Sequence, residues 1–416
     1  MNDRLHRRLR QLGVVKGFRE LEDVSDQEAS EQATSEASRT LPGARVQTPH
    51  GPVWVNRKVY ASDFRHGRYA LRHLRSMPPQ GLELIECPDL GAHPAFIDTE
   101  TTGLAGGTGT LAFLIGVGVW TTEALDLHLI FIRNPDEEGA ALRYLETVLD
   151  DASSLVSFNG RAFDLPILET RFVLNRIPPA CLGLPHLDLL PLARQLWRDH
   201  LSSRRLVVLE ERLLDVARSE EDLPSSLIPY LYRQYLETRE PGDMARVFYH
   251  NRIDVLSLAT LLWHSLRLVM EPEACELSAG EWAGVGRIYD RIGWHQRALG
   301  AWQTALSGDA GEMADDSAER LWQEIGTRHK RAEAWDEANA VWETWIRRIP
   351  LAVDPLVEQA KYFEWVTKDL DAALARTEQA LERAKAWQSS HKRERTIEEL
   401  QHREARLLRK LSREDS

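Results

Sequence analysis

Two carboxylates two residues apart are the first candidates for chemistry in this 416-residue sequence. Asp98 and Glu100 stand in the segment 95–104, which begins as an apolar strand and ends in a glycine-containing turn. Alternate residues of a strand share a face, so the two side chains converge. Burying two like charges is costly unless a cation compensates them, and the pair therefore predicts a hard divalent ion such as Mg²⁺ or Mn²⁺. The alternative is two exposed acids at a strand end.

Asp164 and Asp254 are the next candidate ligands, and each stands at a recognisable place in a helix. Asp164 opens a helix after a strand over 154–158 and a break at Asn159-Gly160, where it is either a helix cap or a ligand. On a later helix His250 precedes Asp254 by four residues, so the two share a face. Tyr249 lies about 140° around that helix from Asp254.

The elements that must position these side chains form a mixed α/β sheet flanked by helices. Strands are predicted over 109–120 and 125–133, a helix over 137–149 and a fourth strand over 154–158. The glycine-rich stretch 103–109 fits neither a phosphate-binding loop nor a dinucleotide fingerprint, so it is interpreted as a turn beside the metal site. A strand-like piece over 186–188 precedes four arginines: Arg194, Arg198, Arg204 and Arg205.

The acidic residues carry a resemblance to a known family. Asp98-x-Glu100, Asp164 and Asp254, in this order on these elements, resemble the DEDD 3′–5′ exonucleases, which have a ribonuclease H-like fold. The form Asn-Gly-x-x-Phe-Asp that ends at Asp164 is similar to the exonuclease domain of family B DNA polymerases. The wider pattern over about residues 45–270 resembles the bacterial YprB-like (MrfB-like) exonucleases, and it includes His50-Gly51-Pro52 and the segments 203–210 and 248–258.

This resemblance implies a metal-dependent 3′–5′ exonuclease that hydrolyses phosphodiester bonds. Two Mg²⁺ or Mn²⁺ ions would be held by the four acids. Asp98, Glu100 and Asp254 would bind the ion that carries the attacking water. Asp98 would also bind the second ion, with Asp164 assisting through water. The resemblance further suggests contacts to nucleic acid from Thr101, Leu104, Asn159, Phe163, Arg204 and Arg205.

The general base has two candidates. One subtype of the family has a tyrosine four residues before the last Asp, and the other has a histidine five residues before it. This chain has His250 at four and Tyr249 at five. Helix periodicity places His250 beside Asp254, so we expect His250 to be the base and keep Tyr249 as the alternative.

The flanks of the predicted exonuclease domain, residues 93–270, have a different character. Residues 1–40 are predicted to be a flexible arm, basic at first and then rich in Ser, Glu and Ala. Residues 41–92 are expected to form a β-containing extension packed on the nuclease core. Basic and aromatic residues alternate in it, which suits either a solvated surface or a nucleic-acid strand: Arg57, Lys58, Tyr60, Phe64, Arg65, His66, Arg68 and Tyr69.

The region 276–416 is predicted to be an all-α domain of tetratricopeptide-like repeats. Nine of the 13 tryptophans occur from Trp282 onward. Two successive sets of positions match the repeat pattern. The last helix, expected over 382–410, would be a polar cap. The repeats would bind a protein partner or serve as a structural brace. The matching positions are Trp282, Gly286, Tyr289, Ala298, Trp302 and Ala305, then Trp322, Gly326, His329, Ala338, Trp342 and Pro350.

Bulk properties restrict the class of protein. The net charge of −12 argues against a globally basic nucleic-acid binder, although acids that hold metal ions are compatible with one. The first residues lack the apolar core of a signal peptide, and the longest apolar run, 111–120, is too short to span a bilayer. We therefore expect a cytoplasmic protein without a membrane partner, and its three cysteines are expected to be reduced.

Substrate and partner stay open at this stage. YprB-like relatives are associated with a DEAD/DEAH-type helicase and DNA repair, so the resemblance favours DNA over RNA. The alternatives are an RNA-processing exonuclease and a non-catalytic nucleic-acid scaffold that uses the helical repeats. Strand preference and oligomeric state are not readable from the sequence, because contacts to the 2′-hydroxyl leave no motif.

Overall fold

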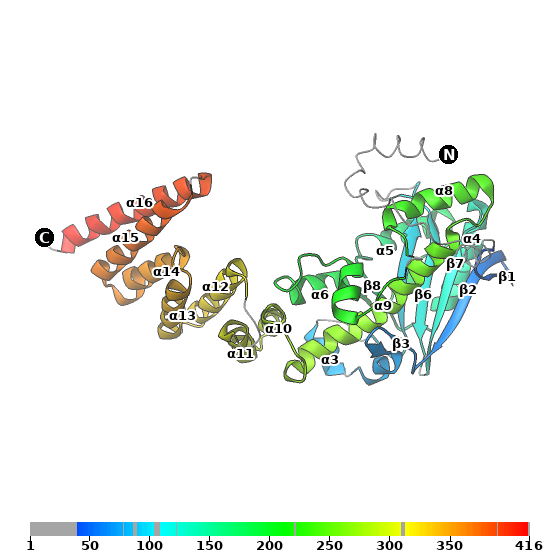
Figure 1. The fold of residues 1–416 in the computed structure, drawn as a ribbon, viewed down its shortest axis with the longest axis horizontal. Helices are drawn as coiled ribbons and strands as arrows, with labels where there is room; N and C mark the ends of the chain where they lie inside the picture. Colours follow the sequence, from blue (N-terminus) through cyan, green and yellow to red (C-terminus); the bar gives the residue numbers. More distant parts are fainter. Residues whose placement is uncertain are drawn as a thin grey trace, which may run out of the picture.

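The computed structural model describes residues 40–77, 79–85, 90–103, 109–121, 123–219, 222–308, 313–388 and 390–414. Within them an α/β body is followed by an arm of paired helices that extends away from it (Figure 1). The predicted fold class, a mixed sheet flanked by helices and then an all-helical region, is confirmed. Residues 1–39 of the predicted flexible arm (1–40) and Leu104 lie outside the described residues.

A seven-stranded mixed sheet forms the centre of the body. Its order is β1-β2-β7-β6-β5-β8-β9, and only β5–β8 and β8–β9 are parallel pairs among the described strands. A two-stranded ribbon lies beside it, made of β3 (Arg65–His66) and β4 (Tyr69–Ala70). The seven strands are β1 (Ala44–Thr48), β2 (Gly51–Ala61), β5 (Pro94–Thr101), β6 (Ala112–Trp120), β7 (Ala124–Phe131), β8 (Ser154–Ser157) and β9 (His186–Asp188).

Strand β5 changes character along its length. Pro94 to Ile97 are buried, whereas Asp98 to Thr101 are partly exposed, so the acidic end of the strand emerges from the core. Its neighbour β6 is buried at every position. Asp98 pairs with Gly116, and the register shifts between Glu100 and Thr101. The two carboxylates of β5 therefore lie at the C-terminal end of a central strand, where the buried core meets the surface.

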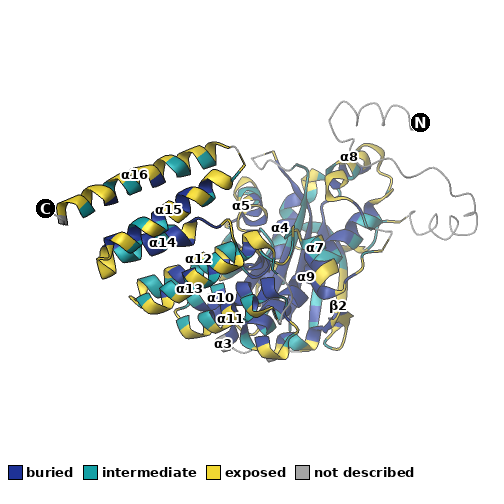
Figure 2. Cartoon of the chain, turned by 60° about the vertical axis from the view of Figure 1, so that its left-hand side comes forward, coloured by how far each residue is buried: buried dark blue, intermediate teal, exposed yellow. Residues whose placement is uncertain are grey.

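Helix α9 (Met244–Met270) is the long core helix of the body (Figure 2). It crosses the sheet where β6 has glycines. A Cβ at Gly116 would lie 2.1 Å from Oδ1 of Asn251, and one at Gly118 would lie 3.1 Å from Val255. The other helices of the body are α3 (Pro79–Leu84), α4 (Glu138–Leu149), α5 (Asp164–Leu174), α6 (Leu189–Leu196), α7 (Leu206–Leu209) and α8 (Ile228–Thr238).

The same helix is apolar and long enough to cross a membrane by length and composition. Its most apolar window has a mean hydropathy of 1.4, and 72% of that window is buried inside the protein. Helix α9 contacts β5, β6 and β7. A helix that is buried against a sheet in this way needs the same apolar composition as a membrane-spanning helix. The absence of a membrane partner stays a prediction.

The arm consists of helix pairs that pack through small residues. Trp302 and Trp342 are each 2% exposed, and a Cβ at Gly286 or Gly326 would lie 2.3 or 2.6 Å from the respective indole. Both tryptophans are therefore interior residues, and glycine is needed opposite each of them. The helices are α10 (Ala279–Arg291), α11 (His295–Ser307), α12 (Asp315–Arg331), α13 (Trp335–Arg348), α14 (Asp354–Tyr362), α15 (Leu370–Ala386) and α16 (His391–Glu414).

One expected element of the arm was wrong. The single helix over 382–410 is divided, since α15 ends at Ala386 and Trp387 takes an extended conformation with φ −67° and ψ 154°. Helix α16 then packs back on α15 through Leu400 and Leu407, which are 3% and 0% exposed. It is thus a packed helix with an apolar stripe, and charge alone did not reveal the turn before it.

The first helices of the arm pack directly on the body. One apolar core runs from the sheet into α10, α11 and α12. A Cβ at Gly284 would lie 2.1 Å from the carbonyl oxygen of Leu196, so the backbones of α10 and α6 are in close contact. Nε1 of Trp197 donates to Glu281 at 3.2 Å across this junction. The predicted domain boundary near residue 270 stays a prediction, and packing is continuous there.

Candidate active site

The predicted acids come from β5, α5 and α9, and they converge at the C-terminal end of β5. Glu100 on β5 and His250 and Asp254 on α9 each offer one ligand atom, and these atoms lie within 4.8 Å of one another. Nε2 of His250 lies 3.9 Å from Oε1 of Glu100 and 3.6 Å from Oδ2 of Asp254. The helical spacing of four residues, which predicted a shared face, accounts for the second contact.

Asp164 is attached to the same strand. Its Oδ1 accepts hydrogen bonds from the backbone N (3.0 Å) and the Oγ1 (2.6 Å) of Thr99, which lies between Asp98 and Glu100. Burial raises the pKa of Asp164, although the hydrogen bonds from Thr99 oppose that rise. Asp164 is the first residue of α5, and its carboxylate is bonded to β5 through Thr99.

Asp98 is held from the opposite side by α9. Nδ2 of Asn251 donates to Oδ2 of Asp98 at 2.7 Å. Burial raises the pKa of Asp98 well above its usual range, and repulsion by Asp254, Asp164 and Glu100 raises it further. Burial and the same two aspartates also raise the pKa of Glu100. This accumulation of buried like charge is what a compensating cation would relieve.

Arg218 is the cation that meets the cluster. It is 9% exposed at its side chain and donates to Oδ1 of Asp254. Glu210, fully buried, fixes it with Nε–Oε2 and Nη2–Oε1 bonds of 2.6 and 2.9 Å, and Asp222 accepts from Nη1 at 3.2 Å. Burial raises the pKa of Asp254 to about 6 even though His250 and Arg218 lower it. One guanidinium therefore does not balance the acids.

His250 contacts the cluster with one nitrogen and a carboxylate with the other. Its Nδ1 lies 2.7 Å from Oδ1 of Asp222 and 3.0 Å from Nη1 of Arg218. When Nδ1 carries the proton it donates to Asp222, and the lone pair of Nε2 then lies near Glu100 and Asp254 and 3.3 Å from Oγ of Ser225. The hydroxyl of Tyr249 instead accepts from the backbone N of Ser219 at 3.1 Å. The structure thus brings His250, and not Tyr249, to the acids; the role of base stays a prediction.

The expected nucleic-acid contacts divide into two groups. Asn159 and Phe163 lie in the turn that leads to Asp164: Asn159 has φ 67° and donates its N to Asp188 at 2.7 Å, and Phe163 is 44% exposed. Thr101 donates to the carbonyl of Gly103 at 2.8 Å at the end of β5. Arg204 and Arg205 stand before α7, where Arg204 donates to the carbonyl of Leu201 at 2.8 Å. Only the first group and Thr101 adjoin the acids in the chain.

The basic and aromatic patch of residues 57–69 is mostly compensated. Arg57 pairs with Asp126 at 2.6 Å and Arg68 with Asp215 at 2.9 Å. His66 is 5% exposed, contacts Oγ of Ser257 at 2.8 Å, and has a pKa lowered to about 4 by burial. Since His66 is neutral and Tyr60 and Tyr69 are buried, the interpretation as a stacking surface for bases loses most of its components.

The donor set fits a divalent metal. Carboxylate oxygens are the hard ligands that Mg²⁺ and Mn²⁺ take, and their raised pKa values show that they lack compensation in the protein alone. Asp98, Glu100, Asp164 and Asp254 are the residues that would hold such ions, and His250 lies within reach of two of them.

Comparison with known proteins defines the class. Residues 95–265 match the model of the RNase H superfamily, a span that includes all four acids and His250. The chain is also 31% identical over 325 residues to the protein named "Uncharacterized protein YprB" of Bacillus subtilis (strain 168), covering 76% of this chain and 75% of that protein. The chain belongs to this YprB-like family. Its residues 95–265 carry a domain of the RNase H superfamily, which indicates a nuclease acting on nucleic acid, and nucleases of this superfamily generally use divalent metals.

Five residues of the site were not predicted: Thr99, which lies between the two predicted acids of β5, and Glu210, Arg218, Asp222 and Asn251. Glu210 and Asn251 stand in segments that carried the family resemblance, so proximity to a motif was the available signal. Arg218 and Asp222 lie between a π-helical turn, η4 (Glu210–Leu214), and the start of α8. Irregular backbone has no periodicity, and the sequence gives no sign that Arg218 meets Asp254, 36 residues further on.

Proposed function

We propose that this protein is a metal-dependent 3′–5′ exonuclease that hydrolyses phosphodiester bonds of nucleic acid, with DNA favoured over RNA. The observation that carries the proposal is the convergence of Asp98, Glu100, Asp164 and Asp254 from β5, α5 and α9 in one buried cluster. The 3′–5′ direction rests on the resemblance of this acidic set to the DEDD exonucleases.

The residues have distinct roles in this proposal. Asp98, Glu100 and Asp254 would hold one divalent ion, and Asp98 with Asp164 would serve a second. Bound divalent ions would supply acidity to the attacking water and charge stabilisation to the leaving oxygen. Nε2 of His250, opposite the Nδ1 that Asp222 engages, would accept the proton of the water. Asn251 and Thr99 would keep Asp98 and Asp164 in place.

Digestion of end-labelled substrates tests the proposal. Single- and double-stranded DNA and RNA, labelled at either end, are incubated with Mg²⁺, Mn²⁺ or EDTA. We expect mononucleotides released from the 3′ end, only with metal, and none from Asp98→Ala. Release from the 5′ end, internal cleavage or a fully active Asp98→Ala would contradict it. A protein that binds these substrates but cleaves none in any metal would be the non-catalytic scaffold.

We further propose that the helical arm is of the tetratricopeptide type and recruits a protein partner. The family resemblance suggests a DEAD/DEAH-type helicase and a role in DNA repair. The buried Trp302 and Trp342 opposite Gly286 and Gly326 support a repeat with regular helix pairs. Co-purification of the full chain with the candidate helicase, with and without nucleic acid, tests the partner; a complex that vanishes on nuclease treatment would show tethering by nucleic acid and not protein contact.

A further inference from the structure

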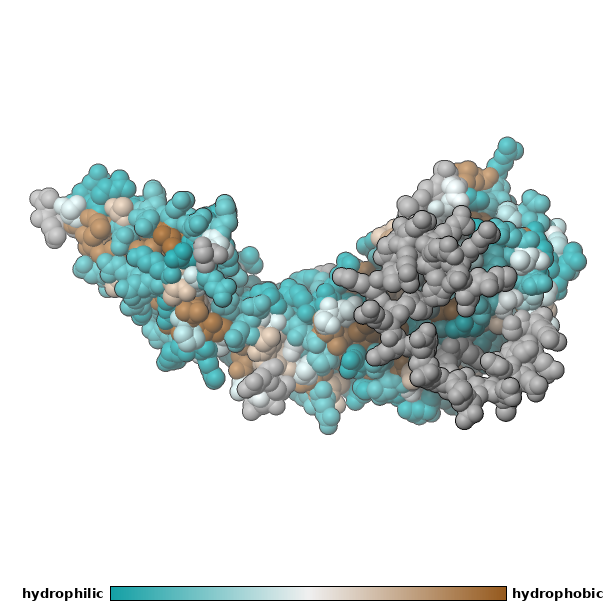
Figure 3. Space-filling model, turned by 45° about the horizontal axis from the view of Figure 1, so that its top comes forward, coloured by the Kyte–Doolittle hydropathy of each residue, from teal (hydrophilic) through white to brown (hydrophobic). Residues whose placement is uncertain are grey.

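A groove runs along the inner helices of the arm. Two hollows of about 540 and 490 Å³ share Gln323, Thr327 and Arg331 on α12, so they are neighbouring parts of one surface. The first lies between α12 and α14, and the second extends from α12 over α10 to Arg198 after α6. Figure 3 shows the wide concavity between body and arm on one face of the molecule. We call the surface formed by the two hollows the arm groove.

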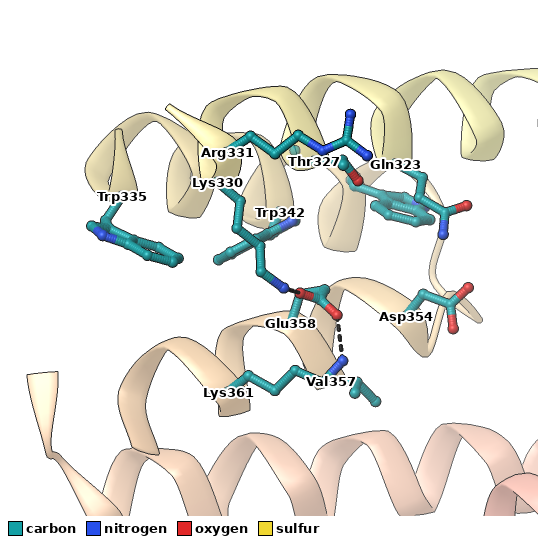
Figure 4. A pocket seen from close by; sticks show the side chains of 12 residues that line it. Gln323, Thr327, Lys330, Arg331, Trp335, Trp342, Asp354, Val357, Glu358 and Lys361 are labelled. Carbon is teal, nitrogen blue, oxygen red and sulfur yellow. Dashed lines mark hydrogen bonds and ion pairs between the residues drawn. The ribbon is translucent and has the colours of Figure 1, made fainter. Parts of the chain in front are cut away.

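The arm groove is basic, in contrast to the chain as a whole. Eight Arg and Lys side chains line the two hollows, against four Asp and Glu side chains, while the whole chain has a net charge of −12. The side chain of Arg331 is exposed, and its guanidinium forms no hydrogen bond or ion pair with another described residue. Lys330 and Lys361 both bind Glu358, at 2.6 Å each, so one carboxylate faces two ammonium groups (Figure 4). In the second hollow, Arg198, Arg287 and Arg320 are paired with the buried Asp199. The excess of cations therefore lies in the first hollow, where three cations face two acids, and it favours an anionic ligand.

The floor of the first hollow is apolar and has one unused donor. Trp342 and Trp345 are each 2% exposed, and Val357 lines the hollow from α14. Nε1 of Trp345 is buried without a hydrogen-bond partner among the described residues. The exposed Gln323 and Thr327, four residues apart on α12, offer further polar atoms along the same ridge.

These features favour a peptide over a nucleic-acid strand. Stacking of bases needs open aromatic faces, but Trp302, Trp342 and Trp345 are buried and Trp335 is partly buried. Asp290, Glu324, Asp354 and Glu358 are interspersed among the cations and would repel a uniformly charged phosphate backbone. A polypeptide can place carboxylates against the cations, an apolar side chain over the indoles and backbone N–H groups toward the acids.

We propose that the arm groove binds an acidic segment of another protein, one that combines Asp or Glu with a large apolar residue. This inference deepens the proposal of a partner-binding arm, and it does not depend on the nuclease chemistry. Arg331 would pair with a carboxylate of the segment, and the hollow floored by Trp342 and Trp345 would receive its apolar side chain.

Fluorescence anisotropy in EDTA tests this proposal without nucleic-acid cleavage. The probe is a labelled peptide of four Glu-Asp-Leu-Glu repeats, compared with its Gln/Asn counterpart and with a labelled 16-nucleotide oligo-dT. The full chain is compared with Arg331→Glu and with Arg347→Glu, an exposed position on α13 that lines neither hollow. We expect the acidic peptide to bind, and Arg331→Glu to weaken it about tenfold while Arg347→Glu changes it little.

Four results would overturn the proposal. The acidic peptide fails to bind, or both Arg variants weaken it equally. Alternatively, oligo-dT is the ligand whose affinity drops selectively in Arg331→Glu, which would make the groove a nucleic-acid surface. Finally, the peptide binds only after Glu20, Glu22, Asp23, Asp26, Glu28 and Glu31 are changed to Gln or Asn, which would show that the groove serves the acidic segment of this chain itself.

Discussion

Two buried acidic sites in this protein, the single carboxylate of Asp199 and the active-site cluster, have opposite electrostatic arrangements. Asp199, at the junction of body and arm, is 2% exposed at its side chain and bonds Arg287 (2.8 Å), Arg320 (2.9 Å) and Ser317 (3.0 Å). Burial would raise its pKa, but the bond from Arg320 and the charges of Arg287 and Arg198 lower it. In the active-site cluster four acids meet one arginine, and their pKa values are raised.

This difference separates a structural acid from a functional one. A buried carboxylate with enough donors stabilises the fold, and removing it leaves its cations uncompensated. A buried carboxylate among other carboxylates destabilises the fold. Such an arrangement is typical of functional sites, where the carboxylates are needed for chemistry. Burial alone therefore does not identify a catalytic acid, whereas the balance of charge around it does.

The largest effect should come from the acids of the cluster. We expect Asp98→Ala to lower nucleotide release about 10³-fold or more, equivalent to at least ~4 kcal/mol of transition-state stabilisation, while the protein stays folded. Asp98→Asn, which keeps the shape, should be equally inactive because the charge is needed. Nucleotide release and thermal unfolding are measured on the same samples. Near-normal turnover of Asp98→Ala in Mg²⁺ would rule out the metal assignment and, with it, the functional half of the comparison.

His250 should give the next largest effect. Its removal in His250→Ala should slow nucleotide release by about 10²–10⁴-fold, the share typical of general acid–base catalysis, without abolishing Mn²⁺ binding by calorimetry. Tyr249→Phe is the matched control, since it removes a hydroxyl that faces Ser219 and not the acids. A silent His250→Ala together with a crippled Tyr249→Phe would exchange the two assignments.

Asp199 should show the opposite behaviour. Asp199→Asn leaves Arg287 and Arg320 without their common carboxylate, so we expect the free energy of unfolding to fall by roughly 3 kcal/mol. Turnover of a short oligonucleotide should persist in the folded fraction. Asp290→Asn is the control, because that carboxylate is 29% exposed, contacts the half-exposed His295 at 2.9 Å and lies 3.7 Å from Arg328; its replacement should cost under about 1 kcal/mol. Equal losses in the two variants would erase the contrast.

The pH dependence of stability gives the smallest and most specific test. The pKa of Asp254 is raised from 3.8 to about 6, so the metal-free folded protein binds this proton more tightly than the unfolded chain does. Its contribution is fully present below about pH 4 and is lost as pH rises through 6, by at most about 3 kcal/mol. The contribution of Asp199, whose pKa is lowered, is instead lost as pH falls below its usual range.

Urea unfolding in EDTA between pH 4.5 and 7.5 measures this dependence. Asp254→Asn should flatten the decline in stability with pH, and it should be at least as stable as the parent at pH 7.5. A decline that keeps the same slope in Asp254→Asn would mean that other groups cause it.

The sequence was most informative where the backbone is regular. Strands β5 to β8 and the shared face of His250 and Asp254 follow from alternation and helical period, and both were predicted to within a few residues. The RNase H-like sheet followed by helices was therefore predictable. Trp302 and Trp342 matched the repeat pattern in the sequence, and both are interior residues in the structure.

What remained hidden depends on contacts between distant segments. Asn251 binds Asp98 across 153 positions of the chain, and Arg218 joins Glu210, Asp222 and Asp254 from an irregular loop. The basic residues near Arg57 were interpreted as a surface patch, but their partners, such as Asp126, come from a neighbouring strand. Charge compensation is a property of the folded chain, and local composition does not contain it.

Helix α9 connects the active-site acids with the junction of body and arm, where Asp199 lies. Its 27 residues span about 40 Å as one rod, and Asp254 lies in its N-terminal half. Toward the other end His264 stacks on Trp197, and the carbonyl of Val269 accepts from Tyr289 of the arm at 2.7 Å. A displacement of the arm relative to the body would therefore act on α9, the helix that also carries His250 and Asp254.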